Sequence, residues 1–114
     1  MRLQEIIDIL DAEVLSGAAL VDGLEVNAAF GSDMMSDVLA YVTDQGLLLT
    51  GLVNPQVVRT AEMMDISVIV FVRGKKPDVS VIELADAKNI VLLSTEQRMY
   101  PACGELYKAG LKAV

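Results

Sequence analysis

Two short turns carry most of the chemistry that the sequence could perform. The segments LLLTGLVNP (47–55) and VIVFVRGKKP (68–77) each contain an apolar run, then a glycine, and a proline three or four residues later. The second turn holds Arg73, Lys75 and Lys76, three of the nine basic residues of an acidic chain. A glycine-containing turn that exposes backbone N–H groups at the start of a helix can bind an anion. These turns are therefore candidates for an anionic ligand.

A third turn follows the apolar run at 90–94. In an open parallel sheet, ligands bind outside the carboxyl ends of the strands, and all three turns would lie at that edge. The candidate ligand-binding residues are Thr50, Gly51, Asn54, Arg73, Gly74, Lys75, Ser94 and Thr95.

A purely structural interpretation explains the same residues. Asn54 and Pro55 are a common N-cap and first residue of a helix, and Ser94 with Gln97 matches a capping box. Lysines in a turn are typical solvent-facing charges. The strict phosphate-binding motifs are absent from the sequence, because neither GxxxxGK[ST] nor GxGxxG occurs. The sequence leaves both interpretations open.

Residues suited to catalysis are scarce. The chain has no His, which removes His-activated nucleophiles and the usual general base near neutral pH. We therefore expect no catalytic residue, no cofactor and no enzymatic activity. The alternative is a small enzyme acting on a phosphorylated substrate at the carboxyl ends of the strands. In that hypothesis Arg73 and Lys75 supply positive charge, and Asp33 or Asp37 acts as the base.

Metal and thiol chemistry have weak support. Asp33 and Asp37 are four residues apart, so two carboxylates on one helix face could bind a divalent ion. Helix capping and the helix dipole explain Asp33 without a metal, and we predict no metal site. The single cysteine, Cys103, excludes an intrachain disulfide and any Cys-pair metal site. We expect it to be buried and structural.

The composition favours a cytoplasmic protein that associates with itself. A net charge of −7 is unsuited to nucleic acid, and no apolar run approaches the ~20 residues that span a bilayer. The N-terminal residues do not resemble a signal peptide. The 54% hydrophobic content exceeds what a domain of 114 residues comfortably buries, which predicts a homodimer. Adjacent helical residues cannot both face one core, so the Met pairs supply the expected interface: Met34, Met35, Met63 and Met64.

Apolar periodicity places these residues on regular elements. It predicts a helix at 3–10, strands at 12–17 and 24–31 around a loop at 17–23, and a helix capped by Ser32 or Asp33 that runs through Tyr41. After a break at Gln45-Gly46, strands at 46–50, 67–72 and 90–94 alternate with helices at 55–65, 78–88 and 96–109. This alternation is typical of βα units in a parallel sheet. We predict one α/β domain over residues 1–114, a mainly parallel sheet flanked by helices, with the 67–72 strand buried on both faces.

Most of the chain resembles a DRTGG domain, in the form of a small stand-alone member of that family. The resemblance lies in AAFGSDMMSDVLAYV, LLLTGLVNPQVVRTAEMMDI, VIVFVRGKKPDVSVIELADAKNIVLLST and the closing helix. The letters that name the family are absent here. The Thr-Gly-Gly element of larger relatives is replaced by Val72-Arg73-Gly74.

The resemblance implies a function without catalysis. Similar domains are accessory, dimer-forming or regulatory parts of some phosphotransacetylases and of CBS-linked pyrophosphatases, and a similar fold forms the N-terminal domain of HPr kinase/phosphorylase. Their catalytic residues lie elsewhere, and no phosphotransacetylase active site is carried over. The resemblance therefore implies a homodimeric regulatory or interaction module, whose partners are a second copy and a protein partner or a small anion or nucleotide.

Overall fold

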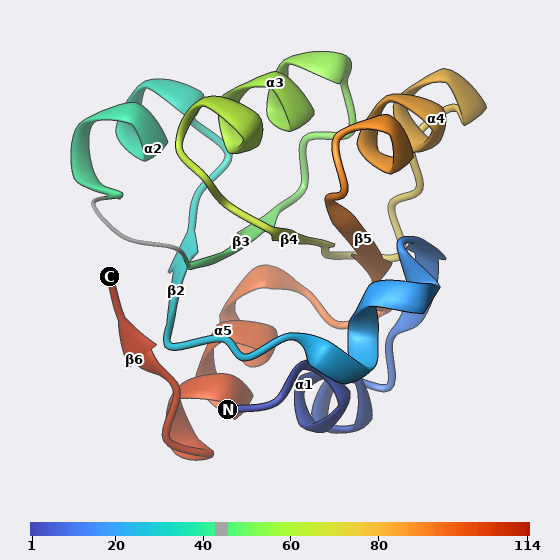
Figure 1. Ribbon diagram of the computed structural model, residues 1–114. Helices are drawn as coiled ribbons and strands as arrows, with labels where there is room; N and C mark the ends of the chain where they lie inside the picture. Colours follow the sequence, from blue (N-terminus) through green and yellow to red (C-terminus); the bar gives the residue numbers. More distant parts are fainter. Residues whose placement is uncertain (43–45) are drawn as a thin grey trace.

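The computed structural model describes residues 1–42 and 46–114 as one sheet with helices on both faces (Figure 1). The helices are α1 (Leu3–Leu10), the 3₁₀ helix η1 (Ala18–Gly23), α2 (Met35–Tyr41), α3 (Pro55–Met63), α4 (Val79–Ala87) and α5 (Met99–Lys108). The strands are β1 (Glu13–Ser16), β2 (Ala28–Gly31), β3 (Leu47–Thr50), β4 (Val68–Phe71), β5 (Val91–Ser94) and β6 (Lys112–Ala113).

The sheet is mostly parallel, in the order β1-β5-β4-β3-β2-β6. Leu48 of β3 lies beside Ile69 of β4, which lies beside Leu92 of β5, and all three strands run in the same direction. β2 and β6 continue this parallel arrangement, whereas β1 pairs antiparallel with β5 at the edge. The predicted α/β class and the three parallel strands are confirmed.

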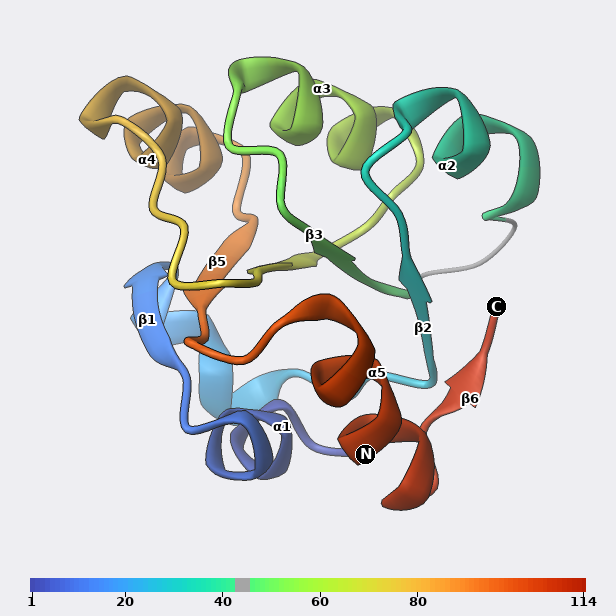
Figure 2. The same cartoon turned by 180° about the vertical axis from the view of Figure 1, so that it is seen from behind.

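Two helical layers bury the centre of the sheet. Helices α2, α3 and α4 cover one face, while α1 and α5 cover the other (Figures 1 and 2). Ile69 belongs to the core under α2–α4, and its neighbour Val70 belongs to the core under α1 and α5. Every residue of β3, β4 and β5 is buried, because each alternating side chain meets a helix layer. The prediction of a central strand buried on both faces is confirmed.

The strand predicted at 12–17 forms β1, whereas the segments around η1, β2 and β6 depart from the predicted pattern. The segment predicted as a strand at 24–31 forms β2 only from Ala28, and the 24–27 part makes an isolated bridge between Arg2 and Glu25. The predicted loop at 17–23 contains η1, and β6 was not predicted at all. Of the predicted break at Gln45-Gly46, Gln45 lies outside the described residues. The pairs at both edges of the sheet are short, so local periodicity carries little information about them.

Two predicted helix starts are wrong for one reason. Met34, not Ser32 or Asp33, occupies the N-cap position of α2, and Arg98 occupies that of α5, which begins at Met99; neither side chain makes a capping hydrogen bond. The capping box at Ser94 therefore does not form. The hydroxyl of Ser94 donates to the carbonyl of Lys75, and the Asp33 carboxylate accepts from Gly51, so both side chains bond to distant turns. Long-range hydrogen bonds thus replace local capping for Asp33 and Ser94, while the Ser32 hydroxyl bonds to the backbone of Met34, one residue before α2.

Within the part of the chain that the structure describes, no helix combines the length and the apolar character needed to cross a membrane.

The buried centre of β4 gives the first prediction. Replacing Ile69 with Ala should lower the free energy of unfolding by about 2–5 kcal/mol, through lost transfer energy and a residual cavity. Val79→Ala is the matched control, because the Val79 side chain is 68% exposed and its truncation should cost under about 0.5 kcal/mol. Urea denaturation measures both values. Equal effects of the two changes would contradict the burial of β4.

Candidate functional site

The carboxyl ends of β2, β3, β4 and β5 lie at one edge of the sheet, because these strands are parallel. We call the segments that follow them, 32–34, 51–54, 72–78 and 95–98, the carboxyl edge. Every predicted ligand-binding residue lies on these segments or is the last residue of its strand, as Thr50 and Ser94 are. The structure divides these residues into two groups.

The first group surrounds the Asp33 carboxylate. Asp33 Oδ1 accepts hydrogen bonds from the backbone N–H of Gly51 at 2.6 Å and from the Thr50 hydroxyl at 3.1 Å. Thr50 Oγ1 also accepts from the N–H of Leu52 at 3.1 Å. Arg73 Nη1 lies 3.9 Å from Asp33 Oδ2, and both side chains are a little under half exposed. A backbone amide, a hydroxyl and a guanidinium therefore converge on one carboxylate.

Gly51 makes this convergence possible. The guanidinium of Arg73 lies where a Cβ on residue 51 would stand, so any larger residue would displace it. Arg73 itself has φ +62°, a left-handed backbone conformation that is uncommon for a residue with a side chain. The backbone of the β4–α4 turn thus directs the Arg73 side chain back across β3 toward Asp33.

The second group joins the β4–α4 turn to the β5–α5 turn. The N–H of Arg73 donates to the carbonyl of Gln97, and the N–H of Gly74 donates to the carbonyl of Thr95, both at 2.8 Å. The Ser94 hydroxyl donates to the carbonyl of Lys75 at 2.9 Å. The buried Thr95 hydroxyl donates to the carbonyl of Leu10 at 2.7 Å, which ties the same turn to the end of α1.

These hydrogen bonds occupy the crevice where an open sheet usually holds a ligand. The chain leaves β4 toward the α2–α4 layer and leaves β5 toward α5 on the other face, so the two adjacent strands form a topological switch point (Figures 1 and 2). Here the two turns bond to each other across that point. Ser94 and Thr95 therefore have structural partners, whereas Arg73 and Lys75, on the β4–α4 turn, are exposed.

The remaining predicted residues are more dispersed. Lys75 is exposed, and Lys76 Nζ lies 3.2 Å from Glu13 Oε1 in a pair that is about half exposed. Asn54 is the N-cap of α3, as predicted, although its side chain makes no capping hydrogen bond. It lines a small open cavity of about 250 Å³ with Lys76 and Asp78, between the starts of α3 and α4. Asn54 is thus near the basic turn without being part of the Asp33 group.

The metal and thiol predictions concern three residues. Asp33 lies before α2 and Asp37 lies within it, and among the described residues no group of three or more metal-binding side chains occurs. Cys103 is half-buried on α5, where its thiol donates to Met99 Sδ at 3.7 Å. Burial raises the pKa of the Cys103 thiol above its ordinary value. A protonated thiol is a poor nucleophile, so this environment fits a packing role.

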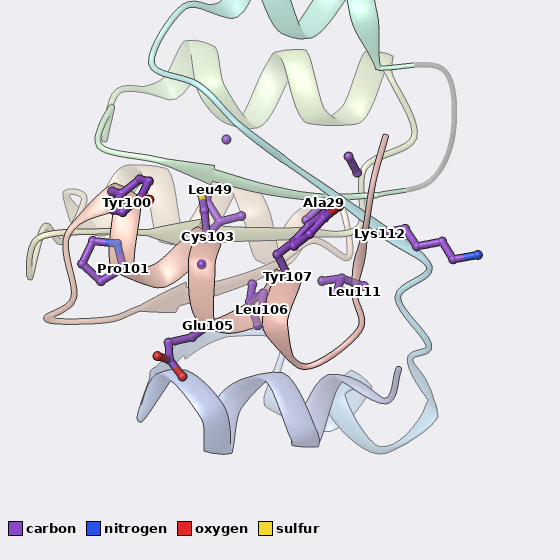
Figure 3. A pocket seen from close by; sticks show the side chains of 13 residues that line it. Ala29, Leu49, Tyr100, Pro101, Cys103, Glu105, Leu106, Tyr107, Leu111 and Lys112 are labelled. Atoms are coloured by element: carbon purple, nitrogen blue, oxygen red, sulfur yellow. The ribbon is translucent and has the colours of Figure 1, made fainter.

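A feature that sequence reasoning missed is an apolar groove on the opposite side of the sheet from α3. It has a volume of about 580 Å³ and lies between α5, β2, β3 and β6 (Figure 3). Its floor is Ala29, Gly31 and Leu49, and α5 contributes Tyr100, Cys103 and Tyr107. The groove exists because β2 offers only small side chains on this face. The signal in the sequence is the spacing of Tyr100, Cys103, Gly104 and Tyr107, which places them on one stripe of a helix.

The comparison with protein families decides the identity of the fold. A family model described as the DRTGG domain matches residues 5–108. The chain belongs to this family. The resemblance inferred from the sequence is thereby confirmed. The comparison with curated proteins gave no match.

A solved structure shows the same fold as this DRTGG domain. It is described as the CBS and DRTGG domains of the regulatory region of Clostridium perfringens pyrophosphatase, complexed with the activator diadenosine tetraphosphate. The TM-score is 0.71 at 18% sequence identity. The similarity covers 91% of this chain and 45% of that chain, so this DRTGG domain spans less than half of its neighbour's length.

The Met pairs of this DRTGG domain each divide between core and surface. Met34 is 60% exposed and Met63 is 70% exposed, while Met35 and Met64 pack against the core under α2–α4. Met34 precedes α2 at the carboxyl edge, whereas Met63 ends α3 at the opposite edge of the sheet. The two exposed methionines therefore lie at opposite ends of the same helix layer.

The left-handed turn after β4 gives the second prediction. Gly74 has φ +68°, and a Cβ there would lie 2.6 Å from the Glu96 carboxylate. Gly74→Ala should therefore lower the free energy of unfolding by about 1–2 kcal/mol, measured in urea. Gly23→Ala is the control, because nothing lies within 4 Å of its added Cβ and its φ is not in the left-handed region. Equal stabilities of the two variants would contradict the strained turn.

Proposed function

We propose that this DRTGG domain is a non-catalytic regulatory module, homodimeric, that senses a small anion or nucleotide at the carboxyl edge. The observation that carries the ligand part is the set of donors around Asp33: the N–H of Gly51, the hydroxyl of Thr50 and the guanidinium of Arg73. Such donors are typical of phosphate sites, because they combine a positive charge with fixed N–H and O–H groups.

In this proposal the Asp33 carboxylate occupies the site in the absence of ligand. An incoming phosphate replaces the carboxylate on Gly51 and Thr50 and gains the guanidinium of Arg73. Lys75 is exposed on the same turn and adds positive charge. Gly51 directly follows β3, and the N–H groups of Val72 and Arg73 donate to the carbonyls of Thr50 and Gln97, so backbone hydrogen bonds position the donors before the ligand arrives.

The comparisons support a regulatory role. The neighbour with the same fold is part of the regulatory region of a pyrophosphatase, and that region was solved with its activator, diadenosine tetraphosphate. For this chain, the fold and the family are shared with that region, and the regulatory role is our proposal.

Anion binding gives the third prediction. Phosphate, AMP, ATP or diadenosine tetraphosphate should raise the stability of the protein, by about 2.7 kcal/mol for a ligand at one hundred times its dissociation constant. Arg73→Ala combined with Lys75→Ala should abolish that gain. Asp33→Asn should increase the affinity for the same anions, because it removes the competing carboxylate. Thermal unfolding at increasing ligand concentration measures all three.

The surface-charge control for this prediction is Arg59→Ala. Arg59 is exposed on α3, so its loss changes the net charge by one without altering the carboxyl edge. Its response to phosphate should equal that of the wild type. A flat response of the wild type and of Asp33→Asn to all four ligands would overturn the ligand part of the proposal.

Self-association rests on apolar side chains that this chain leaves at its surface. Tyr100 is 89% exposed, Tyr107 is 72% exposed, and Met34, Tyr41 and Met63 are each at least 60% exposed. A two-fold homodimer is the commonest closed assembly for a soluble protein, and covering such residues would stabilise it.

The fourth prediction concerns the size of the particle. At micromolar concentration the protein should sediment at equilibrium as twice its 12.3 kDa mass, because the dimer removes apolar surface from water. A single 12.3 kDa species at every concentration up to about a hundred micromolar would overturn the homodimer. Such a result would mean that the free energy of dissociation is below about 6 kcal/mol.

A further inference from the structure

The groove beside α5 presents an apolar stripe that this chain covers only in part. Tyr100, Cys103, Gly104 and Tyr107 repeat at the spacing of one helix face, and all four line the groove. Ala102 and Leu106 of α5 are buried in the core, and Leu106 also borders the groove. Within the stripe, Cys103 packs against the core and contacts Met99, whereas Tyr100 and Tyr107 are 89% and 72% exposed, so the two tyrosines are its uncovered part.

Gly104 lacks an internal explanation. It lies inside α5, where glycine is about 0.5–1 kcal/mol less favourable than alanine. Nothing in the described structure lies within 4 Å of the position that its Cβ would take, and no left-handed φ is needed there. The contacts within this chain thus give no reason for a glycine. A second molecule that approaches α5 closely would give one.

The charges around the groove point to the identity of that molecule. Residues 99–114 contain Glu105, Lys108 and Lys112, so this region carries a net +1 in a chain of net −7. Glu105 and Lys112 both line the groove, and Figure 3 shows their charged groups on opposite sides with Tyr107 between them. Neither makes a salt bridge within residues 1–42 and 46–114.

We infer that a second copy of this chain docks in the groove about a two-fold axis that passes over Tyr107. Such an axis exchanges the two sides of the groove, so it brings each Glu105 toward the partner's Lys112 and places the two Tyr107 rings together. The contact is self-complementary in charge and apolar at its centre, which is the anatomy of a stable interface. This inference rests on the proposed homodimer and names its surface as the α5 groove, not the exposed methionines.

A charge-reversal series tests the two-fold pairing, and it is the fifth prediction. Glu105→Lys and Lys112→Glu should each weaken the dimer about tenfold, because each creates two like-charge contacts across the axis. The double variant E105K/K112E should restore the dissociation constant to within about threefold of the wild type, because both pairs are attractive again. Sedimentation equilibrium at low salt measures the series, since salt screens exposed charges.

Two controls match these variants in charge. Glu83→Lys and Lys88→Glu lie at the other helix layer, on or next to α4, and are exposed, so they change the net charge equally without touching the groove. Both should leave the dissociation constant unchanged. Tyr107→Ser should weaken the dimer at least tenfold while circular dichroism stays native, because the ring is largely exposed in the single chain.

The outcomes separate this inference from the proposed function. A monomeric wild type overturns this inference and the homodimer part of the proposed function, and leaves the ligand part to its own test. A dimer that the reversal series leaves unchanged, and that Met34→Asp or Met63→Asp dissociates, overturns the groove and keeps the homodimer. The two-fold pairing is also overturned if the dissociation constant of the double variant rises by the product of the two factors measured for the single variants. Weakening by the single reversals with recovery in the double variant supports it.

Discussion

The structure depends on the burial of β3, β4 and β5 on both faces. Each of these strands has only apolar residues until its last position, and two helical layers exclude water from all of them. Charged side chains therefore have no place on the central sheet, because an unpaired charge there would be costly. The polar residues of this region appear where the strands end, and the carboxyl edge is the consequence. The position of Arg73 and Asp33 follows from the constraint on the core.

β2 relaxes that constraint. It lies inside the sheet, between β3 and β6, yet all of its residues remain partly accessible. On the α5 face it offers Ala29 and Gly31, and a Cβ on Gly31 would lie 2.9 Å from the sulfur of Cys103. The small residues let α5 approach β2 at one point and leave the groove beside it. Gly31 also directly precedes Ser32 and Asp33, so the groove and the Asp33 group share one strand end.

The sequence predicts those parts of the fold that local patterns control. The runs 47–50, 68–71 and 91–94 are each apolar in their first three residues, so strand type, parallel direction and burial could all be inferred. The partners of Asp33 and Ser94 could not, because each was a plausible helix cap and its actual partner is 18 or 19 residues away. Local capping rules compare only the hydrogen-bond partners within one turn. The fold determines whether a donor or acceptor from a distant turn lies nearer to the side chain than those local partners.

The location of the candidate site was predictable from the sequence, but the hydrogen bonds between its turns were not. Parallel strands bring Thr50, Gly51 and Arg73 to one edge, and the sequence indicates this. That the turns after β4 and β5 bond to each other follows from the left-handed conformations of Arg73 and Gly74, which the residue types alone do not reveal. The groove was missed because its floor is made of small residues, and alanine and glycine give no signal of their own.

The Asp33 carboxylate determines which ligands could use the edge. As a group of the same chain it competes at the effective concentration of a tethered partner, which is on the order of millimolar or higher. Its ion pair with Arg73 is long and about half exposed, so that contact contributes under about 1 kcal/mol, while the bonds to Gly51 and Thr50 hold it in place. A singly charged anion would exchange one carboxylate-like contact for another and gain little. A phosphate with two charges and three free oxygens could bond to Gly51 and Thr50 and bring Arg73 closer at the same time, so the built-in competitor favours phosphates over simple carboxylates.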